Sequence, residues 1–540
     1  MKLPLELRNR IQKFSIKKLP REKLISLLII AAISIILFAL SLYFKNLVSE
    51  WYWRNHGTGF YWTRYDGTTE IATWYIEAYS DASYYYEPYL SSFRYDNWNP
   101  YAGGEGPLNG YAYGPMFIYS IYFVSIFIGL LNPGMETDLL VAESVKWTHI
   151  TFDALSVVVL YIIIISLKSF KDKKKIKHII GIAGSFAFLF VPIKLLYVDS
   201  IYLNTPQMTF FTLLSFLMFL QEKYRISAFI LSIAWLSKQM PLFVVIPWFF
   251  IIWKKKNLKE ALVNFIVIFL ITTLMLSIPW LFLSPRDYMW RVFGPGKPLA
   301  IVDFEHPSNT VSLAHSFLFF GSEGLANFYA VINKYMIPFI LFYLLIVLFA
   351  YFNGKKIGEN ENQFTIFTTW IIINTHLFIS RGVYKYYNAF ITPFVILSFL
   401  TFSEQQASRI TESFKMRKSE EELETDKQIG SKFLMLRKYL LLSFFFLSFS
   451  SLFYYYNVVL IAKERFLHPF LLLILFLIIS VLLSPDIYRS LFKKESYKMI
   501  ITDLKDIYQE VSKYFKEAKD SLFTRFKSKH QKNSTSSKNE

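Results

Sequence analysis

Carboxylate and ammonium groups stand at the edges of long apolar stretches in this sequence, where they could act on a polar substrate held beside a membrane. The first candidate is Asp66, which follows the aromatic run FYWTRY in a polar segment between two such stretches. A carboxylate in these surroundings can act as a general base that takes a proton from an attacking hydroxyl. A solvated loop acid is the alternative interpretation, and Glu70, Asp81 and Asp96 are rivals in the same segment.

Lys238 interrupts an apolar region with the short polar sequence SKQMP. The apolar arms on either side, residues 227–236 and 242–253, are too short to cross a hydrocarbon core of about 30 Å. We therefore expect the tip of this hairpin to lie inside the protein, where a lysine is costly unless it is paired or lines a polar cavity. A phosphate would be a natural partner for Lys238, and Gln239 is its neighbour in the same motif. The alternative is a hairpin tip in water.

One aspartate lies at the end of an apolar stretch and another lies within one. Asp199, in YVDSIYLNTPQ, could hydrogen-bond substrate hydroxyls, although Asp199 or Asn204 could instead cap the next helix. Asp153 lies within the apolar stretch 145–167. Acids at such positions are often functional, but we expect Asp153 to be structural and to pair with a lysine on a neighbouring helix.

Two later segments carry clustered charges, and neither shows the ligand spacing of a metal site. Basic groups in them could hold a phosphate, and carboxylates could hold sugar hydroxyls. Cations in the second segment could alternatively be interfacial residues that reach for the membrane surface. The candidates are Arg291, Asp303 and Glu305 in RVFGPGKPLAIVDFEHPSN, and Arg381 and Lys385 in SRGVYKYY.

The elements that must position these residues are membrane helices. The chain of 540 residues is 54% hydrophobic and 19% aromatic, and several apolar runs are long enough to cross a bilayer. Runs of this length favour an all-α polytopic membrane protein over a barrel. The net charge of +18 lies mainly in loops beside the spans, which is the positive-inside pattern and not a nucleic-acid interface. With no cysteine, disulfides and thiolate sites are excluded.

Basic loops mark the cytoplasmic side, and their order constrains the number of crossings between them. Only one of the apolar segments 115–131 and 145–167 can cross, and we expect the first to lie in the outer interface. Both termini are then cytoplasmic. About twelve spans result, at residues 25–48, 145–167, 179–198, 206–220, 227–236, 242–253, 261–283, 335–351, 364–380, 389–402, 439–460 and 466–483.

This topology divides the chain into five regions. Three external elements converge in it, namely the first loop, the turn at Asp199 and the loop 284–334, and the tip of the short hairpin points the same way. The regions are a basic N-terminus (1–22), a transmembrane module (23–402) with external loops 49–144 and 284–334, a charged linker (403–432), a further transmembrane hairpin (433–484), and a tail (485–540) with an amphipathic helix and a disordered end.

The order of these motifs resembles that of the GT-C membrane glycosyltransferases, particularly the glucosyltransferases that extend dolichol-linked oligosaccharides. The segment SKQMPLFVVIPWFF is similar to that family's Lys-Gln-Met helix motif, and YVDSIYLNTPQ is similar to its Asp-containing turn. RVFGPGKPLAIVDFEHPSN resembles its aromatic loop with a following acid pair, and YDGTTEIATW and YAYGPMFIYS resemble the ends of its first luminal loop. The likeness covers about residues 1–400, and RGVYKYY stands in place of the family's His-Glu-Lys element.

The resemblance implies an inverting hexosyltransferase with a polyprenyl- or dolichyl-phosphate sugar as donor and a lipid-linked glycan as acceptor. It implies an active site on the external or luminal face of the plasma membrane or the endoplasmic reticulum, and no cofactor or metal. A protein or lipid acceptor is an alternative, and so is a transporter or flippase. The implied roles are a base for Asp66, phosphate contacts for Lys238, Arg291, Arg381 and Lys385, and contacts to substrate hydroxyls for Asp199, Asp303 and Glu305, with Gln239 as a further binding residue.

Overall fold

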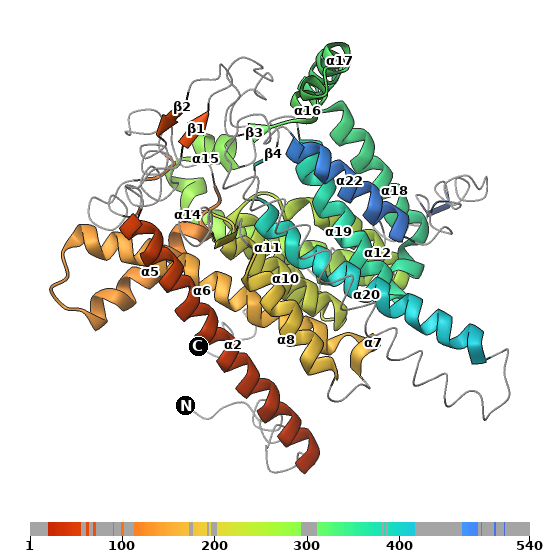
Figure 1. Ribbon diagram of the computed structural model, residues 1–540, viewed down its shortest axis with the longest axis horizontal. Coiled ribbons are helices and arrows are strands. Elements are labelled where there is room, and N and C mark those ends of the chain that lie inside the picture. Colours follow the sequence, from red (N-terminus) through yellow and green to blue (C-terminus); the bar gives the residue numbers. More distant parts are fainter. Residues whose placement is uncertain are drawn as a thin grey trace, which may run out of the picture.

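The structure is a computed structural model in which helices dominate (Figure 1). Four stretches of helix are long and apolar enough to cross a membrane in the part of the chain that is described: Arg21–Glu50, Thr137–Ser166, Leu258–Leu283 and Ile337–Glu359. The chain is a helical membrane protein by these criteria, and the total of twelve spans stays a prediction. The described residues are 20–55, 61–63, 69–71, 90, 99–101, 113–171, 176–191, 194–195, 202, 204–292, 310–379, 383–384, 387–415, 467–483, 488, 502–503 and 512.

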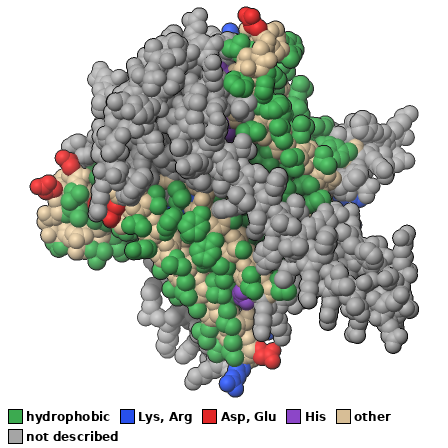
Figure 2. Space-filling view, in the orientation of Figure 1, with side chains coloured by type: hydrophobic (Ala, Val, Ile, Leu, Met, Phe, Trp, Pro, Cys, Tyr) green, Lys and Arg blue, Asp and Glu red, His purple; other side chains and the backbone are tan. Residues whose placement is uncertain are grey.

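The first half of the bundle contains helices of very different length. They are α2 (Arg21–Asn55), α5 (Met116–Leu131), α6 (Thr137–Ser166), α7 (Lys168–Lys171), α8 (Ile176–Leu189), α10 (Pro206–Leu220), α11 (Tyr224–Ser237) and α12 (Leu242–Lys255). Helix α6 is central, with most of its apolar window buried, whereas only a small part of the window of α2 is buried. Hydrophobic side chains cover much of the described surface in Figure 2, and the charged ones gather at its extremities.

The second half begins with a continuous helical run and ends in a packed group of spans. The elements are α13 (Leu258–Ala261), a π-helical turn (Leu262–Val267), α14 (Ile268–Leu283), α15 (Pro285–Val292), α16 (Leu313–Phe319), α17 (Glu323–Lys334), α18 (Ile337–Glu359), α19 (Glu361–Leu377), α20 (Asn388–Lys415) and α22 (Leu467–Leu482). Stacked rings of Phe216, Phe219 and Phe364 join α10 to α19, with Trp248 of α12 against them. These contacts place the aromatic core between the two halves.

Two small antiparallel sheets complete the described structure and were not anticipated from sequence. Strand β1 (Tyr61–Thr63) pairs with β2 (Thr69–Ile71), and β3 (Thr310–Val311) pairs with β4 (Val383–Tyr384). Both sheets lie at the same end of the bundle as α15 (Figure 1). The β3–β4 pair joins two loops that are far apart in the sequence.

Several predicted boundaries need correction. Within the span predicted at 179–198, helix α8 ends at Leu189, and helical backbone returns at Lys194 and Leu195. Pro192 between them lacks the amide hydrogen of a continuous helix and disfavours helix at the residue before it. Helix α6 begins at Thr137 and not at residue 145, so the external segment predicted at 49–144 is partly helical. The loop predicted at 284–334 likewise contains α15, α16 and α17. The span at 439–460 and nearly all of the tail lie outside the described residues.

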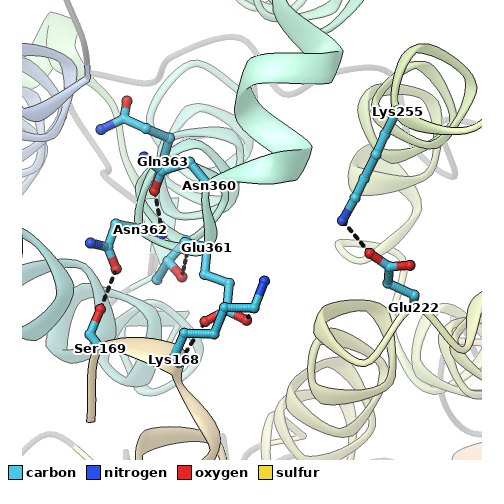
Figure 3. Close-up of polar contacts among 9 residues, drawn as sticks. Lys168, Ser169, Glu222, Lys255, Asn360, Glu361, Asn362 and Gln363 are labelled. Carbon is cyan, nitrogen blue, oxygen red and sulfur yellow. Dashed lines mark hydrogen bonds and ion pairs between the residues drawn. The ribbon is translucent and has the colours of Figure 1, made fainter. Parts of the chain in front are cut away.

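The loops predicted as cytoplasmic meet at one end of the bundle (Figure 3). The amide of Lys168 donates to Glu361 Oε2 at 2.8 Å, and Ser169 Oγ donates to Asn362 Oδ1 at 3.3 Å. A Cβ on Gly354 would come within 3.0 Å of the Lys254 side chain, so the ends of α12 and α18 also lie together there. The shared side that charge parity predicted for these loops is confirmed.

A second set of contacts at this end, the ion pairs of Glu222 that we call the Glu222 clamp, holds the turn between α10 and α11. Glu222 accepts from Lys255 at 2.8 Å (Figure 3) and from Lys256 at 2.6 Å. These ion pairs lower the pKa of the Glu222 carboxyl to about 2. Asp503 contacts Lys254 and Tyr351 close by. Ion pairs between residues that are distant in the sequence therefore hold this end of the bundle together.

Inside the bundle, Asp153 is paired with two lysines. Lys45 of α2 and Lys194 both contact Asp153 Oδ2 of α6, the latter at 2.7 Å, and none of the three side chains is more than 2% exposed. Lys194 Nζ also lies 4.2 Å from the centre of the Phe188 ring. The prediction that Asp153 pairs with a lysine is confirmed, and the pair with Lys45 joins α2 to the core.

We expect Asp153→Asn to destabilise the protein strongly, because it leaves two buried ammonium groups without their carboxylate. Removing one partner of a buried ion pair costs about 3–5 kcal/mol. Asp138→Asn, which changes an exposed acid on the same helix, is the control. Thermal unfolding in detergent should show a clearly lower midpoint for Asp153→Asn alone, and equal midpoints would contradict this role.

The variant Glu222→Gln tests the Glu222 clamp through the pH dependence of the free energy of unfolding. Because the carboxyl pKa lies below its ordinary value of 4.5, the ion pairs stabilise the fold above that value and lose this effect as the pH falls towards about 2. The groups are partly exposed, so the difference should be at most about 1 kcal/mol. The unfolding midpoint of the variant should lie below that of the wild type at pH 7, and the gap should close on acidification. A gap that is constant with pH would argue against the clamp.

Candidate functional site

Lys238 lies fully inside the protein at the tip of the hairpin made by α11 and α12. Each arm has 14 residues, which gives a length of about 21 Å, shorter than the hydrocarbon core. Lys238 is 1% exposed, and its Nζ donates to the carbonyl oxygen of Asn204 at 2.6 Å. The prediction that this tip would be buried is confirmed, and the alternative of a tip in water is wrong.

Two tyrosine rings border the same ammonium group. Lys238 Nζ lies 4.5 Å from the ring centre of Tyr387 and 5.3 Å from that of Tyr113. At these separations the negative ring faces attract the cation. Tyr113 comes from the end of the first loop and Tyr387 from the start of α20, so three segments distant in sequence converge on one charge.

His376 adds a polar group to this cluster. Its ring packs edge-on against Tyr387, with centres 4.8 Å apart, and it is completely buried on α19. Nδ1 lies 2.9 Å from the carbonyl oxygen of Ile372, whereas Nε2 has no hydrogen-bond partner among the described residues. We call Lys238, Tyr113, Asn204, Tyr387 and His376 the Lys238 cage.

The aromatic contacts continue from the cage to α15. The hydroxyl of Tyr101 donates to the Tyr113 carbonyl at 2.8 Å, and the Tyr101 ring packs on Tyr288 of α15, with centres 4.8 Å apart. Asn99 Nδ2 donates to Ser284 Oγ at 2.5 Å beside it. Arg291, half-buried on the last turn of α15, thereby belongs to an element that is tied to the cage through the first loop.

The predicted convergence of the loops is confirmed where it is described. The β3–β4 ladder pairs Thr310 with Tyr384 and Val311 with Val383, so the loop after α15 meets the segment before α20. Tyr202 meets Ser49 at the end of α2, which brings the turn before α10 to the same region. Of the predicted site residues, Lys238, Gln239 and Arg291 are described, and Gln239 is partly buried next to Lys238. The others, Asp66, Asp199, Asp303, Glu305, Arg381 and Lys385, lie outside the described residues.

Sequence reasoning missed Tyr113, Tyr387 and His376. Tyrosine is so frequent in this chain, at 36 residues, that no single ring stood out. His376 had a usable signal, since a histidine within the apolar run TTWIIINTHLF is a polar group at membrane depth. Asn204 was considered only as a helix cap, and its carbonyl proves to be the part that contacts Lys238.

The cage can stabilise an anion, and that is the chemistry it offers. A buried ammonium in a low-dielectric site interacts with a phosphate oxyanion far more strongly than the same group in water. Tyrosine rings add apolar faces on which the C–H groups of a sugar can stack. The imidazole of His376 supplies a hydrogen-bonding atom within the Lys238 cage.

Comparison with known proteins finds no family model that matches the chain and no curated protein similar to it.

Gly114 allows the first loop to approach the hairpin, and Gly114→Ala tests that approach. A Cβ at residue 114 would lie 2.1 Å from the Leu236 carbonyl oxygen and 2.6 Å from the Leu236 Cα. Both are backbone atoms, which cannot rotate away as the end of a side chain could. Overpacking of this kind costs about 1–3 kcal/mol. Gly324→Ala is the matched control, because its Cβ would meet nothing within 4 Å. Thermal unfolding should show a lower midpoint for Gly114→Ala only, and two unchanged midpoints would contradict the close approach.

Proposed function

We propose that the protein is a membrane glycosyltransferase of the GT-C type. It takes a hexose from a polyprenyl-phosphate donor and transfers it to a hydroxyl group of a lipid-linked glycan. The site faces the external or luminal side of the membrane. The observation that carries this proposal is the buried Lys238, surrounded by aromatic and carbonyl groups at the place where the loops converge.

The reaction is a single displacement with inversion at the anomeric carbon. The oxygen of the acceptor hydroxyl forms a bond to that carbon, the bond from the carbon to the phosphate oxygen breaks, and the proton passes to the Asp66 carboxylate. The leaving group is the polyprenyl phosphate, which carries its negative charge without protonation. Lys238 stabilises the charge that grows on the departing oxygen.

The remaining residues hold the two substrates in line. Arg291, Arg381 and Lys385 add positive charge around the phosphate, and Asp199, Asp303 and Glu305 hold hydroxyl groups of the sugars. Support for this grouping comes from the chain itself: Lys385 lies two residues before Tyr387, Asp199 lies five residues before Asn204, and Arg381 precedes β4 by two residues. Gln239 and the imidazole of His376 lie beside the cation and can hydrogen-bond a sugar or phosphate oxygen.

Asp66→Asn should abolish the proposed transfer while leaving the fold intact, because an amide cannot accept the proton. Loss of a general base lowers rates by about 10²–10⁴-fold. The measurement is transfer from a polyprenyl-phosphate hexose to lipid-linked glycans by the protein purified in nanodiscs, with Asp138→Asn as the control. Normal transfer by Asp66→Asn would remove Asp66 from the mechanism and direct the same test to Asp81 and Asp199.

Lys238→Met tests the phosphate contact separately from the base. The variant keeps an unbranched apolar side chain and removes the ammonium group with its charge and hydrogen-bond donors, and we expect transfer to fall by about 10²–10³-fold. Lys259→Met, which alters an exposed lysine at the opposite end of the bundle, should behave as the wild type. If no polyprenyl-phosphate sugar supports transfer by the wild type, while the purified protein moves such lipids between leaflets, the flippase alternative replaces the enzyme.

A further inference from the structure

Helix α17 has three distinct faces. One face packs on the protein through Ala326, Tyr329 and Asn333, which follow each other at spacings of three and four residues. Tyr329 on this face contacts the ring of Phe317 in α16, with centres 5.8 Å apart. A polar face carries Glu323, Asn327 and Lys334, and all three are exposed.

The third face of α17 is exposed and strongly apolar. Its members recur at spacings of three and four residues, so they form one stripe along the helix. In order they are Leu325, Phe328, Val331 and Tyr335, with exposed fractions of 54%, 63%, 61% and 63%. At 100° per residue the stripe, the protein face and the polar face are each separated by roughly a third of a turn around the helix.

The chain turns sharply directly after this helix. Met336 has a φ of 56°, in the left-handed region, and α18 begins at the next residue. Helix α18 is long and apolar enough to cross a membrane. Its far end at Glu359 adjoins the hydrogen bond between the Lys168 amide and Glu361. Helix α17 therefore lies at the opposite end of α18, beyond its first turn, as Figure 1 shows.

The apolar stripe continues onto α18 itself. Ile337, Ile340, Leu341 and Leu344 are exposed at the start of that helix, where a spanning helix meets lipid. Figure 2 shows hydrophobic side chains running from the end where α17 lies down along the neighbouring spans. The exposed face of α17 is thus continuous with the exposed apolar surface of a helix that is long and apolar enough to cross a membrane.

We propose that α17 is an interfacial helix that lies on the membrane surface at the cage end of the bundle. Its Leu325–Phe328–Val331–Tyr335 stripe enters the boundary between headgroups and acyl chains, its Ala326–Tyr329–Asn333 face packs on the protein, and its polar face meets water. A helix with one strongly apolar and one charged face partitions into this zone. The occupant of the stripe is therefore phospholipid, and this holds whatever reaction the protein performs.

The position of α17 also fixes the height of the loop before it. Ser312 and His315 cap α16 by hydrogen bonds in both directions, and Thr310 and Val311 immediately upstream form β3, which pairs with β4 next to the cage. Anchoring α17 in lipid consequently holds the β3 loop at the level of the headgroups, where it borders the Lys238 cage.

The test uses single cysteines, because the natural chain contains none. Nitroxide labels are placed at residues 325, 328 and 331 on the stripe, and at 323 and 327 on the polar face, in full-length protein reconstituted into phosphatidylcholine nanodiscs. We expect the stripe labels to collide at least about threefold more with oxygen, which concentrates in lipid, than with a water-soluble nickel chelate. The polar-face labels should show the reverse order.

Two results would overturn the proposal. Equal accessibility of both faces to the nickel chelate would place α17 in water. Stripe labels that are shielded from both oxygen and the chelate would mean that protein covers the stripe, either another part of the chain or a second copy. Unfolding midpoints of the labelled proteins, compared with the unlabelled wild type, show whether each variant is folded.

Discussion

An ammonium group that is buried in a membrane protein must find other groups to replace its water, and this constraint shapes the cage end of the molecule. Lys238 meets it with one backbone carbonyl and two aromatic faces drawn from the first loop, the start of α10 and the start of α20. Carbonyls and rings compensate a cation only in part, whereas a phosphate would match its charge. The same constraint thus holds the loops together around Lys238.

Two buried groups of charges among the described residues are compensated in different ways. Lys45 and Lys194 share the carboxylate of Asp153, and the pair with Lys45 connects α2 to the core. Breaking such a pair is costly, although the intact pair need not add much stability. Lys238 donates to the carbonyl oxygen of Asn204 and lies beside the rings of Tyr113 and Tyr387, and the neighbouring His376 leaves Nε2 without a described partner. The first group joins two helices, and the second joins loops that are distant in the sequence.

Much of this arrangement could be predicted from the sequence because membrane burial imposes simple rules. The short arms beside Lys238 predicted a buried tip, the basic loops predicted which ends lie together, and a lone acid in an apolar run predicted a lysine partner. Other features depend on pairing that no local pattern encodes. The β3–β4 ladder joins residues more than seventy positions apart, and the roles of Tyr113 and Tyr387 depend on which of many tyrosines the fold brings to Lys238. Helix α17 was hidden within a predicted loop, since its apolar residues are too few and too spaced for a span.

The account depends most directly on whether the Lys238 cage recognises a lipid phosphate. Binding of polyprenyl phosphate and of the uncharged polyprenol to the purified protein in nanodiscs separates the charge from the apolar chain. A charged hydrogen bond is worth about 1.5–3 kcal/mol, so the wild type should prefer the phosphate by about tenfold or more. Lys238→Met should lose that preference. Equal affinity of the wild type for the two lipids, or a preference that Lys238→Met retains, would contradict the account.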